Sequence, residues 1–307
     1  MEKPPIPKLK ENKIENKEGE INPKIVKVLE KWAMKYVKNL EGFEFHGEEH
    51  TNNVVEFSQK ILSFFNDVSK KDKQLLTLSA RYHDSIQGWE ENITKDGKFK
   101  KVKLGRFSGK NEEASADLLC EYMDDVNDIN PGIFNKEDKD KVKTTIMATV
   151  AEYSPEYNTI VNGSILKESP SPLEISLALA DLASAGIKSS EEFIKEGDSL
   201  FIEENLDIKE VIQKGNISDE QKEWIKGRIV SWSNFQIAFS SGRYKVFLEK
   251  ELKLFPEDKQ EEVKKYFSQY EENIEFTKKV AKERSEKTFK ELIKDVYNVN
   301  YQDKTSN

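Results

Sequence analysis

Residues 46–87 read HGEEHTNNVVEFSQKILSFFNDVSKKDKQLLTLSARYHDSIQ, and this stretch decides the fold class. Its first half repeats side chains at spacings of three and four residues, which places them on one face of a helix: His46, His50, Val54, Phe57, Ile61 and Phe64. A second helix, over about 72–87, carries Leu75, Leu76, Leu78, Ala80 and Tyr82. Because His50 is in register with the apolar positions, we expect its ring to point inward.

The same helical spacing continues on both sides of this stretch. It predicts helices from Pro23 onward, over 111–125, over 142–153, after the capping box at Ser171, up to Leu254, and over about 257–296. One segment indicates β structure, because Asp96-Gly97 lies between short alternating stretches. The sequence therefore predicts an all-α fold, a helical bundle with a C-terminal helical extension and at most one short β-hairpin.

The chain divides into four parts by composition and pattern. Residues 1–22 are too polar to order themselves and predict a mobile N-terminal tail, followed by a helical domain over 23–190, a helical extension over 191–298 and a mobile C-terminus over 299–307. An aromatic stripe in the extension faces one way: Trp224, Arg228, Trp232, Phe235 and Phe239. We interpret this stripe as core or as the contact of a possible homodimer, rather than as a cofactor site.

Composition excludes several classes of protein. The 307 residues carry a net charge of −8, which argues against broad nucleic-acid binding. The single cysteine, Cys120, excludes an intramolecular disulfide and a cysteine-cluster zinc site. The sequence has no apolar run of the roughly 20 residues that span a bilayer, and its first residues do not form a secretory signal. We therefore expect a cytoplasmic protein with no membrane partner.

Histidines and carboxylates in apolar helices form the candidate site. All three histidines fall between 46 and 83, and His83 is followed directly by Asp84. Far downstream, Asp181 is the only charged residue between Ile175 and Ile187. Burying a lone carboxylate is costly unless it meets a cation or several donors, and a divalent metal suits inward imidazoles and carboxylates together. The alternative is an internal polar cluster in a purely structural helical protein.

Four residues in their local context resemble a known signature. His50, the His83-Asp84 pair in LSARYHDS and Asp181 in LALADLASAG resemble the H…HD…D signature of the HD superfamily of metal-dependent phosphohydrolases. HTNNVV (50–55) and NEEASADLL (111–119) resemble the neighbouring segments of that family, and the resemblance covers about 25–190. It implies one divalent ion (Mn, Co, Ni, Zn, Fe or Mg) bound by His50, His83, Asp84 and Asp181. It also implies hydrolysis of phosphate mono- or diesters, commonly of nucleotides.

The chain departs from the family at two places. It has no histidine after His83, so a histidine-bridged second metal is excluded, and Asn111 stands where two-metal members can carry one. Gln87 stands where several one-metal members carry a catalytic Glu, and an amide cannot take up a proton. Glu90, Glu91, Glu112 or His46 could substitute for that Glu. His46 is either a proton shuttle or substrate contact, or a histidine at a helix end.

A basic segment follows the His-Asp pair: Lys95, Lys98, Lys100, Lys101, Lys103, Arg106 and Lys110. It could place cations over a substrate phosphate, or it could be a solvated hairpin edge protected by lysines. Arg106, Lys110 and Asn111 are our candidates for substrate binding.

The leading hypothesis from the sequence is a metal-dependent phosphohydrolase of a small phosphorylated molecule, with a nucleotide as the expected substrate. Asp84, Gln87, His46 and Glu112 are its candidate catalytic residues. The alternative is a catalytically weak or inactive HD protein that binds metal and nucleotide as a sensor, which Gln87 favours. If Gln87 leaves the enzyme slow, we expect Gln87→Glu to raise turnover, provided that room for the water is preserved.

Overall fold

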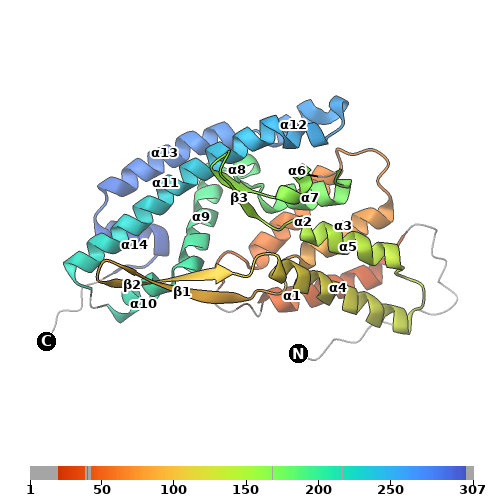
Figure 1. The fold of residues 1–307 in the computed structure, drawn as a ribbon, viewed down its shortest axis with the longest axis horizontal. Helices are drawn as coiled ribbons and strands as arrows, with labels where there is room; N and C mark the ends of the chain where they lie inside the picture. The colour runs from red at the N-terminus through yellow and green to blue at the C-terminus, as the bar shows by residue number, and fades with distance from the viewer. Residues whose placement is uncertain (1–19, 39, 41–42, 168, 216, 302–307) are drawn as a thin grey trace.

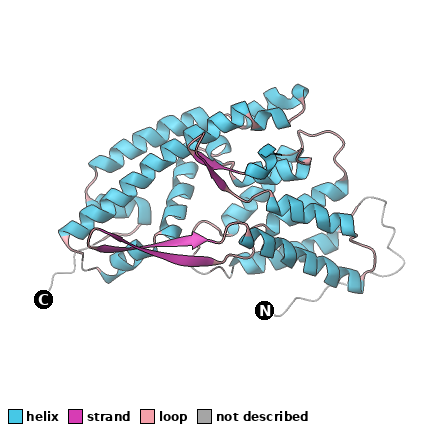
Figure 2. Ribbon diagram, viewed as in Figure 1, coloured by secondary structure: helices cyan, strands magenta, loops and turns pink. Residues whose placement is uncertain are grey.

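The N-terminal part of the chain is a helical bundle whose apolar faces meet in one core (Figure 1). The computed structural model describes residues 20–38, 40, 43–167, 169–215 and 217–301. The bundle contains α1 (Pro23–Lys38), α2 (Glu48–Leu62), α3 (Lys70–Tyr82), α4 (Lys110–Ile129), α5 (Lys136–Met147), α6 (Gly163–Lys167) and α7 (Pro172–Asp181). Leu29, Leu75, Leu119 and Leu177, from four of these helices, have no exposed surface. The predicted all-α class is confirmed (Figure 2).

The C-terminal part adds helices that pack on the bundle and on one another. They are α8 (Ser184–Ile187), α9 (Ser190–Glu204), α10 (Leu206–Lys214), α11 (Asp219–Glu249), α12 (Gln260–Tyr266), α13 (Tyr270–Glu286) and α14 (Phe289–Tyr297), with short 3-10 helices η2 (Glu251–Leu254) and η3 (Glu257–Lys259). The long α11 and α13 run side by side (Figure 1).

Helix α11 spans two apolar cores. Its C-terminal part contributes Phe247 to the core of the bundle, which also includes Phe193 of α9. Its N-terminal part contributes Ile225 and Ile229 to a second core, shared with α9, α10 and α14. The extension is therefore tied to the bundle along its length by buried side chains.

Four of the predicted helices end earlier than expected; α3 ends at Tyr82 and α5 at Met147. Instead of one helix over 257–296, the chain breaks between α12 and α13 and again between α13 and α14, where Thr288 caps a new helix through a reciprocal pair of hydrogen bonds with Glu291. Helix α11 ends at Glu249, and only a 3-10 turn reaches Leu254.

The predicted hairpin is present, and a second, shorter one accompanies it. Strands β1 (Trp89–Asp96) and β2 (Phe99–Arg106) pair antiparallel, and Gly97 takes a positive φ of 62° in the turn. Strands β3 (Glu152–Ser154) and β4 (Thr159–Val161) lie where we expected helix to continue to residue 153. Helix α5 ends at Met147, and Pro155 accounts only for the extended backbone at Ser154, because proline disfavours helical backbone at the residue before it.

Some residues at both ends of the described chain are better ordered than the composition suggested. Ile21, which we placed in the mobile tail, is 1% exposed, and its backbone exchanges two 2.7 Å hydrogen bonds with the Gln74 amide. Tyr301 is 7% exposed in the second core. The rest of both predicted mobile segments, 1–19 and 302–307, lies outside the described residues.

The first hairpin joins the bundle to the extension. It leaves the bundle after α3 and reaches α11, where Trp224 Nε1 donates to Asp96 Oδ2 at 2.9 Å (Figure 1). Phe99 packs on Trp224 with ring centroids 5.1 Å apart, and the backbone of Val102 donates to Asp207 of α10. The hairpin, α9 and α11 thereby surround a space over the bundle. Among the described residues, no helix has the length and apolar character needed to cross a membrane.

Candidate metal centre and cavity

Three helices bring the four predicted ligands together. His50 lies in the first turn of α2, His83 caps the end of α3 with Asp84 directly after it, and Asp181 is the last residue of α7. One ligand atom from each side chain lies within 4.8 Å of all the others. His50, His83 and Asp84 are buried and Asp181 is partly exposed, and the group could hold a divalent metal ion.

The distances within the group fit a shared cation. Nε2 of His83 lies 3.1 Å from Asp84 Oδ2 and 3.3 Å from Asp181 Oδ1. Nε2 of His50 lies 3.2 Å from the same Asp181 oxygen and 3.5 Å from Asp84 Oδ2. Neither Nε2 atom makes a hydrogen bond of good geometry with any described residue, although both are buried. Because a buried polar atom without a partner is costly, two of them facing two carboxylates fit a metal site.

Neighbouring groups hold the two histidines in place. The Nδ1 atom of His83 donates to the carbonyl oxygen of Ala80 at 2.8 Å, which directs the lone pair of Nε2 toward the carboxylates. The Nδ1 atom of His50 lies 3.9 Å from Glu196 Oε1 of α9. Glu196 also accepts from Lys188 Nζ at 2.9 Å. The extension therefore contributes a carboxylate behind one of the candidate ligands.

The charges of the group perturb one another strongly. Burial alone would lower the pKa of His83, but the carboxylates of Asp84 and Asp181 outweigh it and raise that pKa to about 10. Burial alone would also lower the pKa of His50, but the carboxylates of Asp181 and Asp84 raise it above its usual value. Burial would raise the pKa of Asp84, but His83 and Arg106 hold it well below its usual range. The two carboxylates therefore favour positive charge at this point, and a divalent cation would supply it.

Asp84 is fixed by two donors on the side away from the histidines. Its Oδ1 accepts from Arg106 Nη2 at 3.0 Å and from Gln87 Nε2 at 2.8 Å. Gln87 stands where the resemblance implies a catalytic Glu. Its side chain instead orients Asp84, a candidate metal ligand. The amide of Gln87 is a donor to a carboxylate here, and a carboxylate in its place could not donate.

His46 belongs to a polar chain that ends at Asp84. Its ring is 3% exposed and lies in the loop before α2, not in the helix. Nδ1 lies 2.5 Å from Glu203 Oε1 of α9, and Nε2 lies 2.6 Å from Arg106 Nη1. Since a guanidinium can only donate, Nε2 accepts and the proton is on Nδ1, facing Glu203. Burial would raise the pKa of Glu203, but the hydrogen bond from His46 holds it below its usual value.

Among the acidic alternatives, the structure brings only Glu112 near the group. Glu112 is 5% exposed, lies 3.9 Å from Arg106 Nη2, and accepts from the backbone N–H of Gly109 at 2.5 Å. Burial raises its pKa above the usual value. Glu90 and Glu91 are exposed on strand β1, away from the four ligands.

Of the candidate substrate-binding residues, only Arg106 reaches the candidate metal ligands from the wall of the cavity. Arg106 reaches Asp84 and His46, and its side chain is 32% exposed. Lys110 instead places its ammonium over the ring of Phe107 at 5.8 Å, and it does not line the cavity. Asn111 is 3% exposed, and its amide is occupied by the backbone of Gly88, at 2.9 and 3.0 Å, and by Gln87. Asn111 therefore holds the loop after the His-Asp pair.

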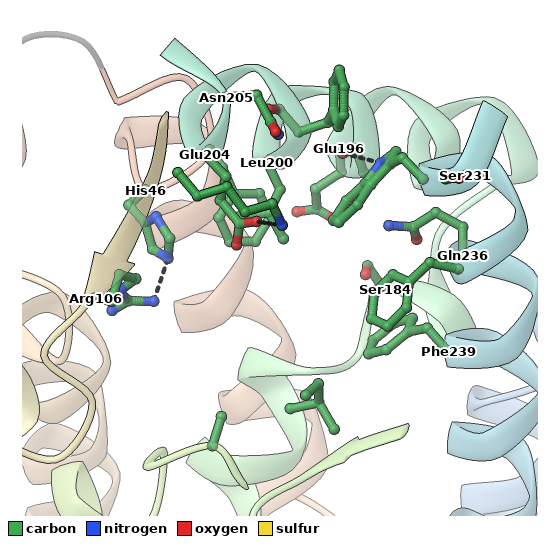
Figure 3. A pocket seen from close by; sticks show the side chains of 18 of the residues that line it. His46, Arg106, Ser184, Glu196, Leu200, Glu204, Asn205, Ser231, Gln236 and Phe239 are labelled. Carbon is green, nitrogen blue, oxygen red and sulfur yellow. Dashed lines mark hydrogen bonds and ion pairs between the residues drawn. The ribbon is translucent and has the colours of Figure 1, made fainter. Parts of the chain in front are cut away.

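The candidate metal centre opens into a cavity of about 890 Å³ between the bundle and the extension. Asp84, Asp181, His46 and Arg106 line one end, and Lys101 and Lys103 line the cavity farther back along strand β2. All five members of the aromatic stripe of α11 line it as well. The stripe that we interpreted as core or dimer contact thus lines a cavity, while Trp224, Trp232 and Phe239 also pack against the two cores. Figure 3 shows His46 and Arg106 across the cavity from Gln236 and Phe239.

Sequence reasoning missed the contribution of α9. Glu196, Leu200 and Glu203 follow Phe193 at spacings of three and four residues, which places carboxylates on an otherwise apolar face directed at the site. That spacing was the available signal, but a helix with acidic residues on several sides also fits a solvated surface.

Comparison with known proteins adds no relative. No protein-family model, curated protein or solved structure matches the chain. The resemblance to the HD superfamily therefore stays a prediction that is carried by His50, His83, Asp84 and Asp181 and by their local sequences.

Proposed function

We propose that this protein is a metal-dependent phosphohydrolase acting on a small phosphorylated molecule, with a nucleotide as the expected substrate. One observation carries the proposal: the buried Nε2 atoms of His50 and His83 lack hydrogen-bond partners among the described residues and face Asp84 and Asp181 at the wall of a large cavity. Side chains from α2, α3 and α7 would hold one divalent ion there. Such an ion polarises a phosphoryl oxygen and lowers the pKa of a bound water.

The cations at this end of the cavity suit a phosphate group. Arg106, whose side chain is 32% exposed, lies beside Asp84, and Lys101 and Lys103, the latter 3.6 Å from Glu204, line the cavity farther back on the same strand. A guanidinium can donate two parallel hydrogen bonds to phosphate oxygens. In the substrate-free protein these donors are directed at His46 and Asp84. We infer that a phosphate competes with both for Arg106 and is positioned next to the candidate metal ligands.

His46 is the group best placed to take up a proton. Glu203 fixes the proton on Nδ1, so that Nε2 carries the lone pair. In the substrate-free protein that lone pair accepts from Arg106. If Arg106 turns to a phosphate, Nε2 becomes free to accept a proton from an attacking water. Glu112, with its raised pKa and its place on the cavity wall, is the second candidate for this role.

A second candidate function is a metal- and nucleotide-binding sensor with weak or no turnover. The observation that favours it is the amide of Gln87, which cannot act as a base and which donates to Asp84. A sensor would bind the same molecules in the same cavity and release no phosphate.

The test is phosphate release from a panel of substrates after the protein has been stripped of metal. The panel combines nucleoside mono-, di- and triphosphates, cyclic dinucleotides and base-free sugar phosphates, with Mn, Co, Ni, Zn, Fe and Mg added one at a time. We expect release from at least one nucleotide that requires added metal and stops with chelator. Binding of metal and nucleotide without release would support the sensor, and a protein that takes up no metal would contradict both functions.

A further inference from the structure

The wall of the cavity far from Arg106 is aromatic. Helix α11 presents Trp232, Phe235 and Phe239 at spacings of three and four residues, and α9 adds Phe193 and Phe201. The rings contact one another, with centroids 5.4 Å apart for Trp232 and Phe235 and 5.7 Å apart for Phe201 and Trp232. Although it borders a cavity, Phe235 remains 38% exposed. An aromatic surface left open in this way is suited to receiving another ring.

One polar side chain lies within this aromatic wall without a partner. Gln236 is 7% exposed, lines the cavity, and its amide makes no hydrogen bond to any residue that the structure describes. Figure 3 shows that amide directed into the cavity. Because the amide reaches the cavity and is not engaged by the protein, its donors and acceptor are available to a ligand.

Glycine at position 197 makes this arrangement possible. A Cβ atom at Gly197 would lie 3.1 Å from the amide carbon of Gln236, closer than most such contacts. The carbonyl oxygen of Gly197 also accepts from Trp232 Nε1 at 3.0 Å. The backbone of α9 thus lets Gln236 lie against it and orients the indole of Trp232 beside the amide.

We propose that the aromatic wall of α9 and α11 binds a planar heteroaromatic ring carried by the substrate, with Gln236 pairing with the ring's edge. This inference rests on the proposed function, because it assumes that ring and phosphate belong to one molecule. Aromatic side chains stack on the face of such a ring, and an amide matches the donors and acceptors at its edge, as nucleobases present them. An alkyl chain would fill the same space but leave Gln236 unpaired.

The size of the cavity agrees with a ligand of this kind. A volume of about 890 Å³ lies near the upper end of the roughly 300–1,000 Å³ typical of small-molecule sites. The charged end and the aromatic end are parts of one continuous space, with Arg106 at one end and Phe239 across from it (Figure 3). A nucleotide has this distribution of charge and aromatic surface, whereas a sugar phosphate has only the charged part.

The experiment is saturation-transfer NMR on the full chain in chelator, which detects weak binding and excludes metal-dependent turnover. The probes are the 5′-monophosphates of adenosine, guanosine, cytidine and uridine, with ribose 5-phosphate and decyl phosphate as base-free controls. For at least one nucleotide we expect the base protons to receive the strongest saturation. We expect Phe235→Leu to weaken its binding about tenfold, since stacking on an aromatic side chain is worth roughly 1–3 kcal/mol. We expect Gln236→Leu to weaken it as well, because it removes the hydrogen bonds to the ring's edge.

The matched control is Phe107→Leu, which removes a ring with the same 38% exposure that does not line the cavity. It should leave nucleotide binding unchanged, and melting temperatures will show whether each variant is folded. The inference is overturned if no base-bearing probe binds, if Gln236→Leu and Phe235→Leu bind nucleotides as the wild type does, or if decyl phosphate binds more tightly than every nucleotide.

The outcome also separates this inference from the proposed function. Binding of nucleotides that depends on Gln236, in a protein that releases no phosphate with any metal, would support the ring site and contradict the hydrolase. Metal-dependent release at equal rates from nucleotides and ribose 5-phosphate would support the hydrolase and overturn the ring site.

Discussion

The two ends of the cavity are lined by different kinds of side chains, which come from different parts of the chain. At the metal end, α2, α3 and α7 of the bundle bring together imidazoles and carboxylates, beside Arg106 of strand β2. At the aromatic end, α9 and α11 of the extension bring together ring side chains and one unpaired amide. The first arrangement could hold a divalent metal ion, and the second offers rings and one amide to a ligand in the cavity.

The two ends differ in the interactions that hold their side chains in place. The side chains around the metal end are fixed by directed hydrogen bonds, such as those from Arg106 and Gln87 to Asp84. The aromatic end is fixed by packing, and Phe235 stays partly exposed. We therefore expect single polar substitutions at the metal end to have large effects, and single substitutions at the aromatic end to have moderate ones.

The largest effect should come from Asp181→Ala. Asp181 Oδ1 is the oxygen that both unpartnered imidazole nitrogens approach, at 3.2 and 3.3 Å. Its loss should reduce bound metal, measured by elemental analysis, to well below one ion per chain and abolish metal-dependent activity. Added metal should raise the melting temperature of the wild type but not of the variant, because a ligand stabilises only the state that binds it.

Asp117→Asn is the control for charge and size, since Asp117 is exposed on α4 and its carboxylate pairs only with Lys143 among the contacts described for it. It should bind metal as the wild type does. Full metal occupancy in Asp181→Ala would remove Asp181 from the ligand set.

The next largest effect should come from His46→Gln, which tests the role of the polar chain that links Glu203 of α9 to Asp84. If His46 accepts the proton, its loss should lower kcat by about 10²–10⁴-fold while metal content is unchanged. Glu203→Gln keeps the shape of the partner but removes its charge, and should lower kcat less than His46→Gln does. A normal kcat in His46→Gln would leave Glu112 as the remaining candidate, to be tested by Glu112→Gln.

The metal end was largely predictable from sequence, whereas the aromatic end was not. His50, His83, Asp84 and Asp181 stand out because polar residues at buried helical positions are rare and costly. The stripe of Trp232, Phe235 and Phe239 has the same spacing whether it meets a core, a second chain or a cavity. Only tertiary packing distinguishes these cases, and helical periodicity carries no information about which surface lies opposite.

Local signals explain the smaller differences in the fold. The hairpin at Asp96-Gly97 was predictable because its turn requires a residue that tolerates positive φ. The second hairpin was not, because Val142, Ile146, Val150 and Tyr153 continue a helical spacing by chance, and Tyr153 proves to be 54% exposed. Lys110 and Arg106 are both basic and close in sequence. Only their placement in the fold distinguishes them, because Arg106 ends strand β2 at the site whereas Lys110 begins α4 outside the cavity.

Replacing Arg106 and Lys110 in turn tests that separation. Arg106→Gln should lower kcat/KM for a phosphorylated substrate roughly 10- to 100-fold, since a hydrogen bond to a charged group is worth about 1.5–3 kcal/mol. Lys110→Gln should leave kcat/KM within about twofold, because its ammonium lies over Phe107 and outside the cavity. Metal content should be unchanged in both. Equal losses in the two variants would contradict the placement of Arg106 as the residue that binds the phosphate.

The smallest effect should come from Gln87→Glu, for which the structure reverses the expectation drawn from sequence. Because the resemblance implies a catalytic Glu at this position, the sequence predicts that Gln87→Glu raises turnover. In the structure the Gln87 amide donates to Asp84 Oδ1 at 2.8 Å, and a carboxylate there would place two like charges in contact. We now expect no gain in kcat, a fall of a few-fold, and a lower melting temperature. Gln87→Leu removes the same hydrogen bond without adding charge, so a larger loss of stability in Gln87→Glu than in Gln87→Leu would isolate the repulsion. A clear rise in kcat for Gln87→Glu would show that the side chain at position 87 turns toward the substrate during the reaction, and that Asp84 does not need its amide.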